Sequence, residues 1–188
     1  MKNEELFFSA SDIDLKSFLL QLYKSMETDY PKFYKMDNLS KLGWLASEIL
    51  IKDEKVIQQY KPEEIGLLFT NANSSLDADI KYFQTIQMAS PALFVYTLPN
   101  ILIGEICIRN KFKGENACFV FEDFNAAFIK EYVEDLFAEE KLKLCICGWV
   151  DVLDEDYKAV LFLVGEDGQT SLKDFSEQNM NEIFKEVV

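Results

Sequence analysis

The longest apolar stretch of the chain lies at residues 88–116 and reads MASPALFVYTLPNILIGEICIRNKFKGEN. It predicts a helix over residues 97–109, because Pro99 would then lie in the first turn, where its missing amide proton costs nothing. This helix is apolar on nearly every face except at Glu105, and such a helix is buried on several sides. Gly104 in its middle costs about 1 kcal/mol relative to alanine, which predicts the close approach of another backbone element. The rest of the fold is therefore expected to pack around this helix.

Apolar runs and helical spacings alternate along the chain. Strands are predicted at residues 65–70, 117–121, 142–152 and 158–164, with a short strand or extended arm at residues 1–11. Helices are predicted at residues 15–26, 39–51, 76–86, 97–109, 124–138 and 179–187, the fifth of them capped at its start by Asp123. This alternation indicates an α/β fold with a layered mixed sheet of about five strands and helices on both faces. We predict one domain over residues 1–188.

The chain is strongly acidic, with a formal net charge of −14. This field repels nucleic acid and anionic membrane surfaces, and no basic stripe offsets it. The first residues are acidic and have no long apolar region behind them, so no signal peptide is expected. Polar residues such as Asn100 and Glu105 interrupt the apolar run at residues 93–108, which argues against a membrane span. We expect a cytoplasmic protein that binds neither nucleic acid nor a membrane.

Four cysteines and the absence of histidine limit the chemistry of these 188 residues. Cys145 and Cys147 lie two residues apart on a predicted strand, so both thiols point to one face, without a second pair in reach to complete a zinc site. Like Cys107 and Cys118, they are expected to be small buried side chains. A chain without histidine supplies no Ser-His or Cys-His nucleophile, histidine base or histidine metal ligand. No metal and no cofactor are predicted.

The central stretch resembles a segment of the β-ketoacyl synthase (3-oxoacyl-ACP synthase) family that precedes the strand leading to its nucleophile. Ten residues match without a gap: Ser90, Pro91, Leu98, Pro99, Asn100, Gly104, Ile106, Ile108, Gly114 and Asn116. The predicted helix at residues 39–51 carries a second match, made by Asp37, Ser40, Lys41, Leu42 and Ala46. The resemblance extends over residues 33–164 and implies the N-terminal half of a thiolase-like fold.

The resemblance also implies where the nucleophile of the family would lie. In β-ketoacyl synthases a cysteine stands between the strand and the following helix, where the helix dipole lowers its pKa and backbone amides form an oxyanion hole. Laid without a gap, the match places this position at Asp123, which cannot form a stable thioester. Cys118 lies inside the preceding strand and is a poor substitute, and the two histidines of the family are absent from the sequence. We therefore predict no catalytic residue of the condensing type.

A non-catalytic partner or scaffold for an active synthase of fatty acid or polyketide biosynthesis is the function that this pattern favours. Half of a two-half fold would expose the apolar face that the missing half covers, and such faces usually mark interfaces. We predict a dimer, either with a full-length β-ketoacyl synthase or with a second copy of this chain. In the family, the strand before the nucleophile helix lies near the dimer axis, which implies an interface at Phe94, Leu98, Phe119 and Phe121.

Two other functions stay open. An acyl-thioester transferase or hydrolase could use a carboxylate, and the candidates are Asp123, Glu122 and Glu105. A module that binds acyl carrier protein would need a basic patch for its acidic partner. The tight basic cluster near the matched stretch consists of Arg109, Lys111 and Lys113.

Overall fold

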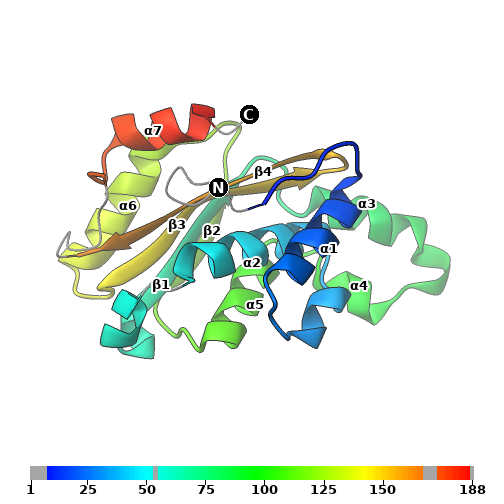
Figure 1. Cartoon of the computed structure of the whole chain (residues 1–188), viewed down its shortest axis with the longest axis horizontal. Helices are drawn as coiled ribbons and strands as arrows, with labels where there is room; N and C mark the ends of the chain where they lie inside the picture. Colours follow the sequence, from blue (N-terminus) through cyan, green and yellow to red (C-terminus); the bar gives the residue numbers. More distant parts are fainter. Residues whose placement is uncertain (1–7, 53–54, 167–172, 187–188) are drawn as a thin grey trace.

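The computed structural model describes residues 8–52, 55–166 and 173–186, and within them it shows a four-stranded mixed sheet with helices on both faces (Figure 1). The strands are β1 (Ile65–Asn71), β2 (Asn116–Val120), β3 (Leu144–Leu153) and β4 (Asp156–Gly165). The helices are α1 (Leu15–Ser25), α2 (Asn38–Ile51), α3 (Leu76–Gln84), α4 (Pro91–Val95), α5 (Ile101–Asn110), α6 (Ala126–Ala138) and α7 (Glu177–Glu186), joined by short 3-10 turns. The predicted α/β class is confirmed.

The strands lie in the order β2-β1-β3-β4. β1 pairs with β2 and β3 in parallel, and β3 pairs with β4 as an antiparallel hairpin. The prediction of about five strands exceeds the described sheet by one. Residues 8–11 of the expected N-terminal strand or arm contain no strand, and residues 1–7 lie outside the described part of the chain.

Each face of the sheet packs against its own hydrophobic core. Leu67 and Phe69 of β1 join the core under α1, α2 and α5, whereas Leu68 joins the core under α6 and α7. This division follows from the alternation of side chains along a strand. Cys145 and Cys147 of β3 are both buried in the core beside α6, as their spacing predicted. Figure 1 shows α6 and α7 on one side of the sheet and α1, α2 and α5 on the other.

The central apolar helix begins later than predicted. α5 starts at Ile101, and Pro99 lies in the turn between α4 and α5 rather than in the first turn of the helix. The predicted close approach at Gly104 is wrong, because no atom outside the helix backbone lies within 4 Å of the space that a Cβ would fill. The tight contact lies on the neighbouring helix α2, where Gly43 leaves room for the side chain of Leu102.

No helix within the described ranges combines the length and apolar character that crossing a bilayer requires.

Two glycines with opposite surroundings test this packing. Gly148 of β3 has a φ of +144° and faces the backbone oxygen of Val160, so Gly148→Ala is expected to lower the free energy of unfolding by at least about 2 kcal/mol. Gly104→Ala is expected to raise it by about 0.5–1 kcal/mol, because the space is open and alanine is the better helix former. Urea unfolding of both variants measures the two changes. Destabilisation by Gly104→Ala would contradict the open space at this position.

Candidate functional site

The turn between β2 and α6 is the candidate site, because it holds the position where the resemblance places a nucleophile. The backbone N–H of Phe121 donates to the carbonyl of Asn71, which fixes the end of β2 beside β1. The N-cap of α6 is Asn125, whose Oδ1 accepts from the N–H of Phe128 at 3.0 Å. The predicted cap Asp123 is therefore wrong, since it lies in the turn two residues earlier.

An aromatic cluster explains the path of this turn. The ring of Phe124 stacks on Phe184 of α7, with centroids 4.2 Å apart and planes at 5°. The ring of Trp149 of β3 is nearly perpendicular to both rings, and Nζ of Lys158 lies 4.1 Å from the centroid of Phe184. Because Phe124 belongs to this cluster, α6 begins only after it, with Asn125 as the N-cap. Asparagine is as good an N-cap as aspartate. The same contacts hold α7 against the turn.

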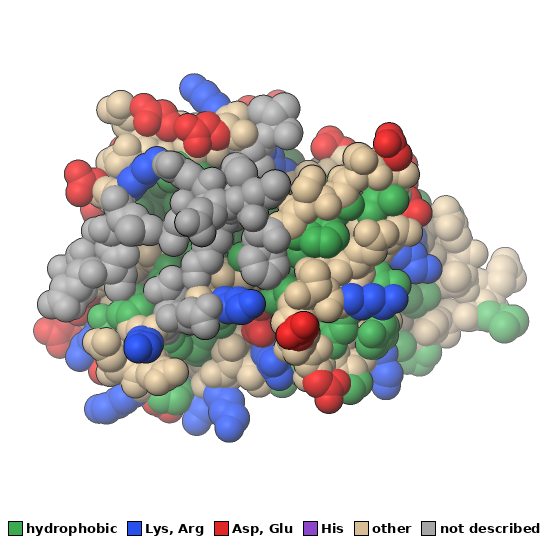
Figure 2. Space-filling model, in the orientation of Figure 1, with side chains coloured by type: hydrophobic (Ala, Val, Ile, Leu, Met, Phe, Trp, Pro, Cys, Tyr) green, Lys and Arg blue, Asp and Glu red, His purple; other side chains and the backbone are tan. Residues whose placement is uncertain are grey.

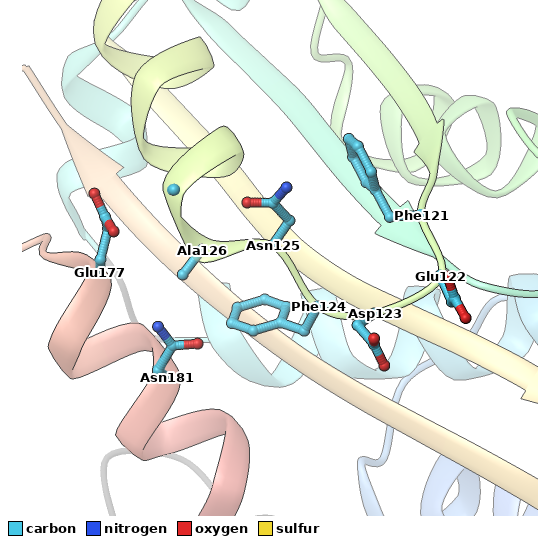
Figure 3. Close-up of a pocket in the computed structure, with 9 residues that line it drawn as sticks. Phe121, Glu122, Asp123, Phe124, Asn125, Ala126, Glu177 and Asn181 are labelled. Atoms are coloured by element: carbon cyan, nitrogen blue, oxygen red, sulfur yellow. The ribbon is translucent and has the colours of Figure 1, made fainter.

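A shallow pocket of about 360 Å³ lies between this turn and α7. Its lining consists of Phe121, Glu122, Asp123, Phe124, Asn125, Ala126, Ala127, Glu177 and Asn181. Figure 3 shows Glu177 and Asn181 projecting from α7, with Glu122 and Asp123 on the opposite side of Phe124. Sequence reasoning did not find Glu177 and Asn181, because nothing local in the sequence brings α7 to the turn.

The chemistry of this pocket is limited to carboxylates, amides and aromatic rings. It contains no thiol, hydroxyl nucleophile or basic side chain that could activate a thioester. No group of three or more carboxylate, thiol or imidazole side chains is placed to hold a metal ion anywhere in the described ranges. The polar groups that the pocket offers to a ligand are therefore carboxylates and amides.

The two half-buried cysteines, Cys107 and Cys118, have thiols that are less acidic than usual. Cys118 is half-buried in β2, and burial raises the pKa of its thiol to about 11. Burial raises the pKa of Cys107 to about 11 as well. A reactive cysteine needs the opposite change, because the thiolate is the nucleophile. These environments are those of structural cysteines.

Glu105, the second carboxylate candidate, is buried in an ion pair away from the turn. Its Oε2 lies 2.7 Å from Nζ of Lys32, and the hydroxyl of Tyr96 donates to its Oε1 at 3.3 Å. Burial, followed by the nearby Glu105 carboxylate, raises the pKa of Tyr96 well above its usual value. Glu105 does not line the pocket beside Asp123. The structure therefore separates Glu105 from the other two carboxylate candidates, Glu122 and Asp123, which line the same pocket.

The predicted basic cluster is divided between two environments. Arg109 turns inward, with Nε 3.6 Å from the Glu48 carboxylate and its guanidinium carbon 5.1 Å from the ring centroid of Tyr30. Lys111 ends α5 in a left-handed conformation with a φ of 61° and is exposed. Lys113 is also exposed and lies 3.5 Å from Glu63. Lys111 and Lys113 thus remain accessible, whereas the ion pair of Arg109 with Glu48 links α5 to α2.

The four predicted interface residues fall into two pairs. Phe94 and Leu98 are exposed on the segment that leads into α5. Phe119 and Phe121 are half-buried, and both rings pack on Phe128 of α6, with centroids 4.9 and 4.8 Å away. Both phenylalanines lie on or directly after β2, which is an edge strand of the described sheet.

Comparison with solved structures identifies the fold. A ketosynthase in complex with its chain length factor from Xenorhabdus doucetiae superposes with a TM-score of 0.55, at 13% identity and over 84% of this chain. The ishigamide ketosynthase/chain length factor gives 0.53 at 18% identity over 64% of this chain. A type II polyketide ketosynthase in complex with its acyl carrier protein gives 0.51 at 16% identity over 76%. The chain has a ketosynthase-like, thiolase-type fold.

The ketosynthase-like chain is shorter than these proteins. It covers 36% of the ishigamide protein, 47% of the type II polyketide ketosynthase and 74% of the Xenorhabdus chain. No protein-family model and no curated protein sequence matches it. At identities this low, the likeness to the solved structures concerns the fold alone.

Thiol reactivity tests whether Cys118 is a structural or a reactive cysteine. With its pKa raised from 9.0 to about 11, the thiolate fraction at neutral pH falls about a hundredfold. We expect iodoacetamide to label native Cys118 far more slowly than the urea-unfolded chain at pH 7.5, with a rate that still rises above pH 9. Peptide mapping by mass spectrometry measures both rates. Rapid labelling that reaches its plateau near pH 7 would contradict the buried, structural assignment.

Proposed function

We propose that the ketosynthase-like chain is a non-catalytic subunit that pairs with an active β-ketoacyl synthase, in the manner of a chain length factor. The observation that carries this proposal is the ketosynthase-like fold, in which the sequence resemblance places the nucleophile position of the family at Asp123. A second observation supports it, since none of the 188 residues is a histidine. A condensing site needs a thiolate and imidazoles, so both would have to come from the partner.

The solved structures with this fold support the choice of partner. Two of them pair a ketosynthase with a chain length factor, and one holds a ketosynthase together with its acyl carrier protein. We propose the same setting for this chain, namely acyl chain assembly of the polyketide or fatty acid type. We further propose that it acts in the cytoplasm and as a single domain.

The edge of the sheet supports an interface at β2. In the parallel ladder, Leu67 donates to Glu115 and Phe121 donates to Asn71. The alternation of such a ladder turns the backbone groups of Cys118 and Val120 away from β1, towards the free edge of the described sheet. An unpaired strand edge is a template for pairing with another chain. The half-buried Phe119 and Phe121 would be covered further by such a partner.

Two alternatives have weaker support. A carboxylate-dependent thioester hydrolase would use Asp123, Glu122 or Glu105, but the first two lie in a shallow pocket without a basic side chain, and Glu105 is buried in its ion pair with Lys32. Docking of acyl carrier protein has one specific observation in its favour, because Lys111 and Lys113 are exposed side chains near the end of α5. This docking is compatible with the proposed subunit role.

Co-expression with a ketosynthase that has an intact Cys-His-His site, taken from the same genome, tests the proposed function. We expect a stable complex in which condensation activity is unchanged by Asp123→Asn, because this carboxylate takes no part in the chemistry. Size-exclusion chromatography with light scattering and a condensation assay measure the two results. The proposal fails if the chain is a monomer at tens of micromolar and binds no synthase. Thioester turnover by the isolated chain that is lost in Asp123→Asn would favour the hydrolase instead.

Charge reversal tests the carrier-protein surface separately. Lys111→Glu with Lys113→Glu is expected to weaken binding of holo acyl carrier protein to the complex about tenfold, since surface charges steer this kind of contact. Lys130→Glu on α6, an exposed-face lysine paired with Glu134, is the matched control. Binding at several salt concentrations measures the effect. Equal loss in the control would show a general charge effect and no docking site at these two lysines.

A further inference from the structure

The C-terminal ends of three helices meet around a second pocket, which has a volume of about 330 Å³. Among the residues that line it, Met26 is the C-cap of α1, Ile51 is the last residue of α2 and Asn110 is the last residue of α5. These helices lie on the side of the sheet away from α6 and α7 (Figure 1). The pocket shares no lining residue with the one at the β2–α6 turn, so it is a separate site.

The electrostatic field in this pocket favours a cation. The C-terminus of a helix carries the equivalent of about half a negative elementary charge, because its last carbonyl groups have no partner within the helix. Glu48 of α2 adds a carboxylate to the lining, and only 13% of its side chain is exposed. The net charge of −14 on the whole chain acts in the same direction. An anionic ligand would therefore meet like charge from four sources.

The basic side chains nearby leave room for a further cation. The guanidinium of Arg109 lies over the rings of Tyr30 and Trp44, and its Nε is 3.6 Å from Oε2 of Glu48, which is longer than an ordinary hydrogen bond. Lys52 is exposed, so water screens its charge. A carboxylate can accept several hydrogen bonds. Oε2 of Glu48 thus keeps the capacity to accept a short hydrogen bond from an N–H group.

Aliphatic side chains form another wall of the same pocket. Met26, Ile51 and Ile57 line it, and all three are partly buried against the core under α1, α2 and α5. Ile57 comes from the 3-10 turn Lys55–Gln59 that follows α2. Apolar walls around a few well-placed polar groups are typical of small-molecule sites. An alkyl chain that entered this pocket could be buried while its polar end reached Glu48.

Charge alone does not single out this pocket on so acidic a protein. Figure 2 shows acidic side chains gathered over α7, and Glu177 and Glu182 of that helix are exposed. An exposed carboxylate gains little from one cation, because water solvates both partners well. The pocket at the helix ends combines a largely buried carboxylate with aliphatic walls, so it can hold a charge and an alkyl chain together.

We propose that this pocket binds a small aliphatic amine in the form of its ammonium ion. The ammonium group donates to Oε2 of Glu48, and the alkyl chain lies against Met26, Ile51 and Ile57. A ligand held between three helix ends stabilises the layer of α1, α2 and α5, since it binds only the folded chain. The inference goes beyond the proposed subunit role, because the pocket lies outside the turn at Asp123 and outside β2.

Titration of the full chain with n-hexylamine at pH 7.5 and physiological salt tests the inference. Methyl NMR of isoleucine-labelled protein is expected to show saturable shifts at Ile51 and Ile57, whereas the exposed Ile80 on α3 is expected to stay unchanged. Sodium hexanoate and n-hexanol have the same chain length but no positive charge. We expect both to bind at least about tenfold more weakly, because neither supplies a charge-assisted hydrogen bond to Glu48.

Two variants separate the roles of charge and apolar contact. Glu48→Gln keeps an oxygen that can accept from Asn110 and is expected to weaken hexylamine binding about tenfold. Ile57→Ala keeps the carboxylate and is expected to weaken binding about threefold through lost apolar contact. Glu182→Gln on α7 is the matched control, because it removes one exposed carboxylate outside the pocket. Circular dichroism and melting temperature check that each variant is folded.

The outcomes that overturn the inference are distinct. Equal affinity for n-hexylamine and n-hexanol would show an apolar site without a role for charge. Equal binding by the wild type and a folded Glu48→Gln, or equal loss in Glu182→Gln, would show general attraction to an acidic protein. Unchanged binding in Ile57→Ala would remove the apolar wall from the site. Shifts that do not saturate would show non-specific association.

Discussion

The burial of β1 on both faces is the constraint on which the rest of the structure depends. Every residue from Ile65 to Asn71 is buried, with Leu67 and Phe69 in one core and Leu68 in the other. A parallel strand of this kind is stable only when helices cover both sides. The layer of α1, α2 and α5 and the layer of α6 and α7 are therefore equally necessary, and the sheet supports everything attached to its ends.

The carboxyl end of the parallel strands carries the features that matter for function. The carboxylate of Asp151 on β3 accepts from the backbone N–H groups of Ala72 and Asn73, which follow β1 directly. This contact fixes the loop that leads into α3. The end of β2 lies beside the end of β1, because Phe121 donates to Asn71. The loop before α3, the edge of β2 and the turn at Asp123 therefore begin close together, so one partner could contact all three.

Local sequence signals predicted the parts of this structure that local interactions determine. The apolar run around Leu67 and the two cysteines spaced two residues apart on β3 predicted two buried strands correctly. Burial of these strands follows from the apolar character of their own side chains. The close contact predicted at Gly104 was wrong, because the glycine that lies against a neighbouring side chain is Gly43 on α2. Asp123 and Asn125 are equivalent caps by residue type. The stack of Phe124 on Phe184 determines that Asn125, rather than Asp123, caps α6. Because the two rings are far apart in the sequence, no local sequence pattern predicts this contact.

The proposed subunit role assigns the function of this scaffold to its surface rather than to chemistry at the turn. A ketosynthase-like fold places a turn at the end of β2 and an apolar segment beside it, and the two have separate physical requirements. In the resemblance the turn carries a thiolate, and here it carries the exposed carboxylates of Glu122 and Asp123. The segment from α3 to the turn before α5 carries exposed apolar side chains, and the sequence has no charge from Tyr82 to Gly104. Exposed apolar surface in water has a free-energy cost of about 25 cal/mol per Å², so a surface of this kind is best explained by a partner that covers it.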